Sequence, residues 1–209
     1  MIWFEYVILP HNKIDNLIQE YSGLLTDSLQ DNGADGNRKP SYASLVGRGI
    51  ILNYLIEHGW SPTKLKDLKV GKNGKPHIVG FKEFNISHSN DIILVGFNDS
   101  GPIGVDIQFH QKVDFSAFKG IFTTSEVKQI NYSLTPIETF YNIWSSKEAV
   151  SKLLGLNLGE SITNIKIFNK SFSFKDIVGS IYKFNLKEEY TLTLATLNTS
   201  DYEIRGYEL

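Results

Sequence analysis

The sequence predicts an α+β fold built from two similar α/β halves. Runs of β-branched and aromatic residues alternate with helical hydrophobic spacing, and this order occurs twice along the chain. Two long helical patterns stop at Gly59 and Gly155, 96 residues apart, and a strand-rich stretch follows each. Identity between the halves is negligible, so the repeat is one of structure. We expect halves at 1–102 and 103–209, with an active site in the cleft between them.

The bulk composition limits the function classes. The chain has 209 residues, 41% hydrophobic and 21% charged, which is typical of a globular protein with a real core. A net charge of −2 argues against a dedicated nucleic-acid-binding protein. With no cysteine there is no disulfide framework, thiolate nucleophile or cysteine zinc site, which fits a reducing compartment.

No membrane or export segment is predicted. Residues 1–10 lack a basic leading segment, and Glu5 interrupts their apolar run, so they indicate a first strand. No apolar stretch approaches the roughly 20 residues that span a bilayer. We therefore expect a soluble cytoplasmic protein.

The first half continues with helices and then strands. Residues 12–25 have helical spacing, and residues 30–40 collect Asp, Asn, Gly and Pro into a loop. Residues 41–59 predict a helix that starts near its serine and is stopped by its glycine. Residues 65–98 predict short strands divided by turns.

The second half repeats this order. Residues 102–109 predict a strand, 123–130 a short helix, and 136–154 a longer helix that Gly155 ends. Five strands are predicted after it: 164–168, 171–174, 180–186, 190–197 and 202–209.

Asp106 and Gln108 lie in the apolar strand 102–109. Strand alternation places their side chains on one face and Val105 and Ile107 on the other. The pair could be the exposed face of an edge strand, or two oxygen ligands for a hard cation such as Mg²⁺. Gln108 offers only a neutral amide oxygen and is the weaker ligand.

The stretch 84–89 ends a predicted strand with Ser87 and Ser89 around His88. A lone histidine is usually structural or exposed, but hydroxyls, imidazole and backbone N–H groups also form phosphate-binding turns. A turn with one lysine, Lys75 before Pro76, carries little specificity by itself.

The helix at 144–155 allows two interpretations. Trp144, Glu148 and Lys152 recur every four residues and share a face, with Lys147 one step round. A Glu–Lys pair at this spacing commonly stabilises an exposed helix by a few tenths of a kcal/mol. Alternatively, Glu148 joins Asp106 around Mg²⁺, and the two lysines neutralise phosphate oxygens beside it.

Several segments occur in an order that resembles the 4′-phosphopantetheinyl transferases, in particular their larger, pseudo-dimeric, surfactin-synthetase-activating type. A Gly-Val-Asp motif ending at Asp106 is followed by 37 residues and then by the Trp-Ser-Ser-Lys-Glu-Ala-Val-Ser-Lys motif of 144–152. The other matching segments are 74–76, 84–89 and 121–127. The resemblance covers most of the chain and is weakest at 10–40 and after 160.

The resemblance implies two halves related by a pseudo-two-fold axis and an enzyme of the holo-[acyl-carrier-protein] synthase type. Such an enzyme uses Mg²⁺, with Mn²⁺ as an alternative, to move the 4′-phosphopantetheine of coenzyme A onto a serine hydroxyl of an apo acyl or peptidyl carrier protein. Adenosine 3′,5′-bisphosphate is released. It also implies a monomer, because the second half supplies the interface that smaller relatives obtain by oligomerising.

The resemblance also implies roles in catalysis. Asp106 and Glu148 would hold Mg²⁺ on the pyrophosphate, and Lys152 would contact the pyrophosphate with Lys147 close by. Glu148 would also deprotonate the serine, directly or through a water molecule.

Further positions match the residues that contact coenzyme A. Ser87 and His88 match contacts to its phosphates, with His88 at the 3′-phosphate. Lys75 and Pro76 match the turn that flanks the adenine.

Two positions depart from the family pattern. Gln108 stands where a second metal-binding Glu is frequent, so we expect weaker Mg²⁺ binding or more waters around the ion. Ala43 stands where an arginine is frequent, and Arg38, Lys39 or Arg48 are the candidates to contact the 3′-phosphate instead.

Two alternative functions remain possible, and one aromatic segment has two possible interpretations. Gln108 and Ala43 also suit a coenzyme A-binding module without catalysis, and a metal-dependent phosphohydrolase would share the ligands without explaining the motif order. The aromatic stretch 113–122, with Lys112 and Lys119, is either a docking surface for acidic carrier helices or simply core.

Overall fold

A computed structural model describes most of the chain. The described residues are 1–9, 12–25, 41–71, 74–118, 120–156, 162–184, 186–197 and 202–207, the last group by its backbone only. Two compact units are present: Met1–Ser100 with Asp201–Leu209, and Gly101–Ser200.

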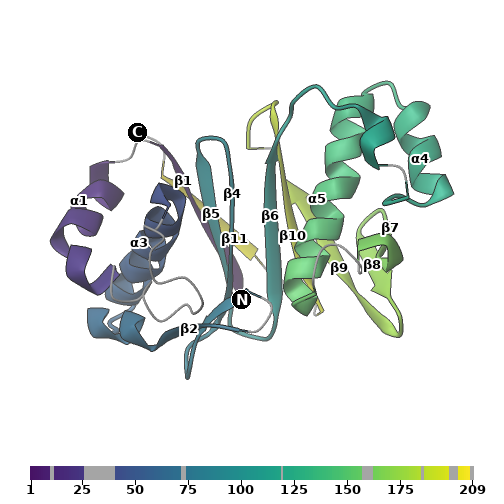
Figure 1. Ribbon diagram of the computed structural model, residues 1–209. Helices are drawn as coiled ribbons and strands as arrows, with labels where there is room; N and C mark the ends of the chain where they lie inside the picture. Colours follow the sequence, from purple (N-terminus) through teal and green to yellow (C-terminus); the bar gives the residue numbers. More distant parts are fainter. Residues whose placement is uncertain are drawn as a thin grey trace. The chain divides into compact units, whose positions relative to one another are not determined.

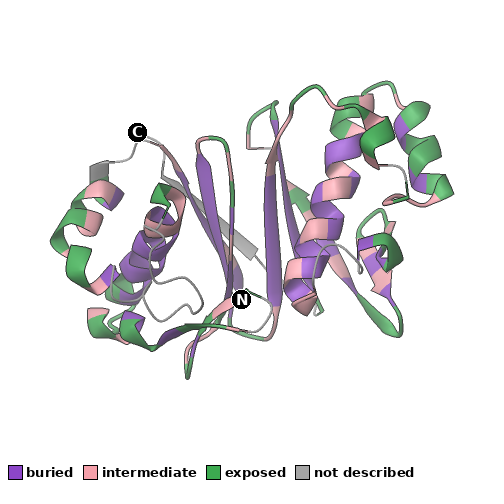
Figure 2. Cartoon of the chain, viewed as in Figure 1, coloured by how far each residue is buried: buried purple, intermediate pink, exposed green. Residues whose placement is uncertain are grey.

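The first unit contains a four-stranded sheet with the order β11-β1-β5-β4. β1 pairs antiparallel with β5 and parallel with β11, and β4 pairs antiparallel with β5 (Figure 1). These strands are β1 (Ile2–Ile8), β4 (Glu83–Ser89), β5 (Ile92–Asn98) and β11 (Tyr202–Tyr207). β5 is buried along its whole length, which explains its continuous apolar sequence (Figure 2).

In the described part of this unit, the α-helices include α1 (Asn12–Glu20) and α3 (Tyr42–Glu57). α3 begins after Ser41, whose side chain accepts a hydrogen bond from the Ser44 backbone N–H, and Gly59 follows its end with a φ of +75°. The sequence signals at both ends of this helix are therefore confirmed. Further elements are the 3₁₀ helix η1 (Pro62–Asp67), β2 (Leu68–Val70) and β3 (Pro76–Ile78).

The second unit contains a five-stranded antiparallel sheet with the order β6-β10-β9-β8-β7. Its strands are β6 (Ile103–Phe109), β7 (Lys166–Phe168), β8 (Ser171–Phe174), β9 (Ile177–Phe184) and β10 (Tyr190–Thr196). The long helix α5 packs along β6 and β10 (Figure 1).

The long helix α5 covers Pro136–Leu154 and is followed by Gly155 in the left-handed conformation, as predicted. The short helix α4 lies one residue later than the predicted 123–130, and it starts with a capping box between Thr123 and Glu126. The described helices of this unit are η2 (Phe115–Phe118), α4 (Thr124–Asn131), α5 (Pro136–Leu154) and η3 (Ile162–Asn164).

Gly104 lets α5 approach β6 unusually closely. A Cβ at this position would lie 2.5 Å from the backbone nitrogen of Leu153 and still nearer the carbonyl oxygen of Ala149. Both atoms are backbone, so no side chain could move aside. The glycine therefore sets the separation of helix and strand, and with it the distance between the side chains that face each other across the contact.

The predicted α+β class is confirmed, and each predicted strand and helix has a counterpart. The halves 1–102 and 103–209 and their pseudo-two-fold relation stay a prediction. One detail differs from those boundaries: residues 201–209 group with the first unit, because β11 pairs with β1. In the described part of the chain, no helix is long and apolar enough to cross a membrane.

Candidate active site

Asp106 is buried where β6 meets α5. Asp106 lies two residues from both Gly104 and Gln108, so these three positions share one face of β6. Gly104 on this face directly approaches the backbone of α5, so the Asp106 side chain points to the face that α5 covers, and the residue is only 1% exposed. β6 is an edge strand of its sheet, but this face is covered. The interpretation of Asp106 as an exposed edge-strand residue is therefore wrong.

Four side chains form a cluster around this carboxylate, which we name the carboxylate cluster: Asp106, Gln108, Glu148 and Lys152. The Lys152 ammonium lies 2.6 Å from Asp106 Oδ1. The Gln108 amide nitrogen donates to Asp106 Oδ2 at 2.9 Å and to Glu148 Oε2 at 3.4 Å. Glu148 and Lys152, four residues apart on α5, thus both point toward β6. They are therefore not an exposed ion pair whose role is limited to stabilising the helix.

Buried hydroxyl groups form hydrogen bonds next to the carboxylate cluster. Ser145 Oγ donates to the backbone carbonyl of Asp106 at 3.4 Å and lies 3.0 Å from Thr193 Oγ1 on β10. Both hydroxyl-bearing residues are fully buried, so they tie α5 to two strands under the Asp106 carboxylate. This contact could not be predicted, because two small polar residues 48 positions apart form no recognisable sequence pattern.

Burial and the neighbouring carboxylate raise the pKa of Glu148 to about 8. Burial is the largest cause, followed by the charge of Asp106, while the Lys152 ammonium acts in the opposite direction. When Glu148 is ionised, two carboxylates face one ammonium, and this excess of negative charge attracts a cation. A carboxyl group with its pKa near neutrality is also suited to accept or give a proton.

The chemistry of the cluster fits a divalent cation that is also held by a substrate. No group of three His, Cys, Asp or Glu residues that could hold a metal occurs among the described residues, so Asp106 and Glu148 supply only two carboxylates. Mg²⁺ is typically held by one or two carboxylates together with substrate phosphates and water. The Gln108 amide already bridges the two carboxylates, and turning it over would present its oxygen as a third ligand.

Lys147 is not part of this cluster. It is fully buried, and its ammonium lies 3.2 Å from Glu126 Oε2 and donates to the backbone carbonyls of Ile162 and Ile165 at 3.2 and 2.5 Å. Its predicted contact with coenzyme A does not agree with this position. The position of Lys147 could not be predicted from the sequence, because its partner Glu126 belongs to a different helix and no sequence pattern pairs the two residues.

The predicted phosphate-binding residues Ser87 and His88 lie within β4 and not in a turn. Their side chains point to opposite faces: Ser87 is buried, and His88 is exposed on the face that bears Ile86. Gly47 of α3 closely approaches Ile86, so His88 is on the side of the sheet that α3 covers. These two side chains cannot grip one phosphate from the same face.

The other predicted coenzyme A contacts also lie in the first unit. Lys75 pairs with Glu83 at 3.2 Å, just before Pro76 opens β3. Arg48 of α3 is only 7% exposed, and burial lowers its pKa to about 10. Its Nη1 donates to the Ser44 carbonyl at 3.4 Å, and its Nε has no partner among the described residues. The candidates Arg38 and Lys39 lie outside the described residues.

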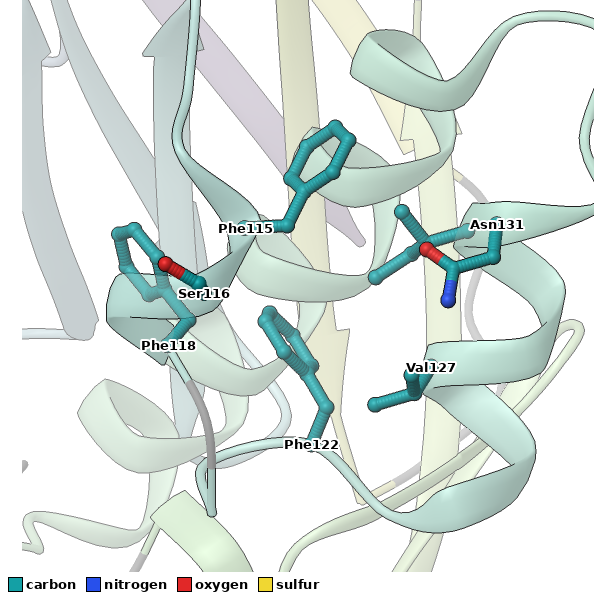
Figure 3. A pocket seen from close by; sticks show the side chains of 7 residues that line it. Phe115, Ser116, Phe118, Phe122, Val127 and Asn131 are labelled. Carbon is teal, nitrogen blue, oxygen red and sulfur yellow. The ribbon is translucent and has the colours of Figure 1, made fainter.

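The aromatic stretch 113–122 is both core and surface. Phe118 contacts Phe140 and Trp144 of α5 with ring centroids 4.9 and 5.3 Å apart, so the stretch packs on the helix that carries Glu148. Phe118 also borders a cavity of about 320 Å³, together with two other aromatic rings of the stretch (Figure 3). We name this cavity the aromatic pocket; it is lined by Phe115, Ser116, Phe118, Phe122, Val127, Ile130 and Asn131. Lys119 lies outside the described residues.

Comparison with known proteins gives consistent results. Residues 102–203 match the family model of the 4′-phosphopantetheinyl transferase superfamily. The 4′-phosphopantetheinyl transferase gsp of Aneurinibacillus migulanus is 27% identical over 196 residues, covering 92% of this chain and 80% of that protein.

Two further relatives are similar over a shorter stretch. The 4′-phosphopantetheinyl transferase AcpT of Salmonella typhi is 30% identical over 140 residues, covering 64% of this chain and 68% of the relative. The L-aminoadipate-semialdehyde dehydrogenase-phosphopantetheinyl transferase of Schizosaccharomyces pombe is 29% identical over 157 residues, covering 65% and 60%.

Proposed function

The chain belongs to the 4′-phosphopantetheinyl transferase superfamily and is a transferase, and we propose that it transfers the 4′-phosphopantetheine of coenzyme A to a serine of an apo carrier protein with the help of Mg²⁺. The observation that supports this most directly is the carboxylate cluster, where Asp106, Glu148 and Lys152 converge from β6 and α5. Relatives with transferase names support the reaction class.

The reaction explains why these charges are needed together. The carrier serine must attack a pyrophosphate that is already anionic, so the enzyme must screen charge and align the nucleophile. The serine oxygen forms a bond to the β-phosphorus of coenzyme A. The bond from that phosphorus to the bridging oxygen breaks, and adenosine 3′,5′-bisphosphate leaves with the electron pair.

Glu148 and Lys152 would divide the work of this step. The Glu148 carboxylate, with its pKa raised toward neutrality, would take the proton from the serine hydroxyl. Lys152 is 26% exposed at its side chain, so its ammonium can exchange part of its contact with Asp106 for a pyrophosphate oxygen.

Asp106 and Glu148 are the residues that would hold Mg²⁺, with the Gln108 amide oxygen or a water at a third position. When bound, the ion would neutralise charge that develops on the pyrophosphate. Mn²⁺ prefers similar oxygen ligands and would be accepted as well.

Residues of the first unit would bind the nucleotide portion of coenzyme A. We assign the 3′-phosphate to Arg48 and His88, the adenine edge to Lys75 and Pro76, and a further phosphate contact to Ser87. Arg48 has the best physical case, because a nearly buried guanidinium with an unpartnered Nε gains much from an anionic ligand.

The aromatic pocket is our candidate docking site for the carrier. Its wall residue Val127 is 39% exposed, so part of the apolar lining is accessible to a partner. Lys112 lies just before the stretch and suits an acidic carrier helix. We also expect a cytoplasmic protein that is a monomer, and sedimentation of the purified chain would test the oligomeric state.

A panel of apo acyl and peptidyl carrier proteins tests the proposed function. Each is incubated with coenzyme A, Mg²⁺ and enzyme, and the mass of the carrier is measured. We expect a phosphopantetheine adduct on at least one carrier, and no adduct with Glu148→Gln. Binding of coenzyme A without transfer to any carrier would instead indicate a binding module, and a Glu148→Gln enzyme with full activity would remove the role of this carboxylate.

A further inference from the structure

A buried ion pair lies one residue from the carboxylate cluster but takes no part in it. Lys147 of α5 and Glu126 of α4 are 0% and 4% exposed at their side chains, and the ammonium lies 3.2 Å from Glu126 Oε2. Two charges out of water are costly, and apolar residues of similar volume would often fill such a site at least as stably. The pair is therefore weakly explained by stability alone.

The contacts of Lys147 link three segments. Its ammonium reaches Glu126 on α4 and the carbonyls of Ile162 and Ile165, which lie at η3 and just before β7. The ammonium has three hydrogens and three acceptors around it, so its direction is fixed. Since Lys147 is rooted in α5, these contacts fix the rotation of that helix about its own axis.

Glu126 is held through one of its two carboxylate oxygens, since its Oε1 is buried with no hydrogen-bond partner among the described residues. Its Oε2 also accepts the backbone N–H of Thr123 at 2.7 Å, as part of the capping box that begins α4. The next residue, Val127, lines the aromatic pocket, and Ile130 lies one turn further along the same helix. The ion pair therefore connects the wall of the pocket to the helix that carries Glu148 and Lys152.

We propose that Lys147 and Glu126 are positioning residues that hold the pocket wall and the catalytic helix in a fixed register. This proposal rests on the proposed transfer reaction with the pocket as carrier site. The ion pair would keep Glu148 aligned with the serine of a carrier seated on α4, without contacting either substrate. Its loss should lower turnover of the carrier and leave the affinity for coenzyme A unchanged.

The key variant removes both charges and keeps the volume: Lys147→Met with Glu126→Gln. Glutamine can still accept the Thr123 N–H, so the cap of α4 is retained, and methionine fills the space of the lysine stem without directing it. The single variants leave one buried charge uncompensated, and their melting midpoints should fall on the order of 10 °C. The double variant should recover most of that loss.

Turnover decides between a positioning and a merely structural role. At a temperature well below every midpoint, we expect the double variant to show at least a tenfold lower kcat toward the carrier, with the KM for coenzyme A within twofold of the wild type. A double variant that regains both its midpoint and its kcat would overturn the proposal. Lys187→Met with Glu188→Gln, an exposed pair before β10, removes the same charges and serves as the control.

Hydrogen exchange provides a measurement that does not depend on activity. In the double variant, the amides of α4 should exchange at least tenfold faster, while those of β6 and β10 are unchanged. If the wild-type chain modifies no carrier, the proposed function fails, and the exchange of α4 alone then decides whether the pair fixes the two helices. If Lys147→Met variants do not fold, Glu126→Gln alone should show the faster exchange, and wild-type exchange in it would refute the coupling.

Discussion

Replacing Gln108 by glutamate should lower the free energy of unfolding and raise the affinity for Mg²⁺. The Gln108 amide donates to Asp106 at 2.9 Å and to Glu148 at 3.4 Å. Glutamate cannot donate these bonds when ionised and adds a third negative charge. A hydrogen bond to a charged acceptor contributes about 1.5–3 kcal/mol, so Gln108→Glu should cost about 2 kcal/mol of unfolding free energy.

The same substitution should strengthen Mg²⁺ binding. A third carboxylate replaces a neutral amide as an oxygen ligand, and its gain is reduced by repulsion from Asp106 and Glu148 in the empty site. We expect a net tenfold lower Kd for Mg²⁺, equivalent to about 1.4 kcal/mol. Metal should therefore restore most of the lost stability.

Thermal melting with and without Mg²⁺, together with calorimetric Mg²⁺ titration, measures both effects. For a chain of this size, about 2 kcal/mol corresponds to a fall of about 4–8 °C in the metal-free Tm. Gln129→Glu, on the exposed surface of α4, adds the same charge away from the strand and is the matched control. If Gln108→Glu matches this control in both Tm and Kd, Gln108 does not bridge the carboxylates and is not at a metal position.

Three further predictions concern other parts of the second unit. Because burial and Asp106 raise the pKa of Glu148 to about 8, its stabilisation of the metal-free fold is complete below about pH 4.5 and is lost as pH rises toward 8, by up to about 1.4 kcal/mol per pH unit. Denaturant unfolding from pH 5 to 8 should show this loss in the wild type relative to Glu148→Gln, and parallel curves would contradict the raised pKa. Gly104→Ala should cost at least about 1–3 kcal/mol and abolish transfer, because the new methyl group meets the α5 backbone; a stable, active variant would show that the helix can retreat. Val127→Glu should raise the KM for the carrier at least tenfold while the KM for coenzyme A stays constant, because it places a negative charge in an apolar pocket facing an acidic carrier; an unchanged carrier KM would place docking elsewhere.

Most helices and strands could be predicted from the sequence, because the residues that determine their ends and their type lie close together along the chain. Ser41, Gly59 and Gly155 mark helix ends through backbone chemistry that acts within a few residues. Strands such as 92–98 can be predicted from their apolar, β-branched composition. Such signals need no knowledge of which elements finally touch.

The site was readable only in part, for the opposite reason. Asp106, Glu148 and Lys152 could be grouped because a family pattern joins positions far apart in sequence, and the structure does bring them together. Lys147 stands in the same pattern, yet its ammonium is held by Glu126. Whether a helical lysine faces a substrate or a buried partner depends on the rotation of its helix, which sequence spacing alone does not set.

The parallel pairing of β11 with β1 makes the first unit discontinuous in sequence. Its sheet takes three strands from residues before 100 and one from beyond 200, with the entire second unit between them. During synthesis on the ribosome, β1 therefore cannot pair with β11 until the second unit has emerged. Over that interval the apolar strand Ile2–Ile8 has an open hydrogen-bonding edge, the kind of edge that recruits strands from other chains. Chaperone demand and inclusion-body formation should consequently be set by the time at which β11 arrives, and fusing an independently folding partner in front of β1 would not shorten that wait.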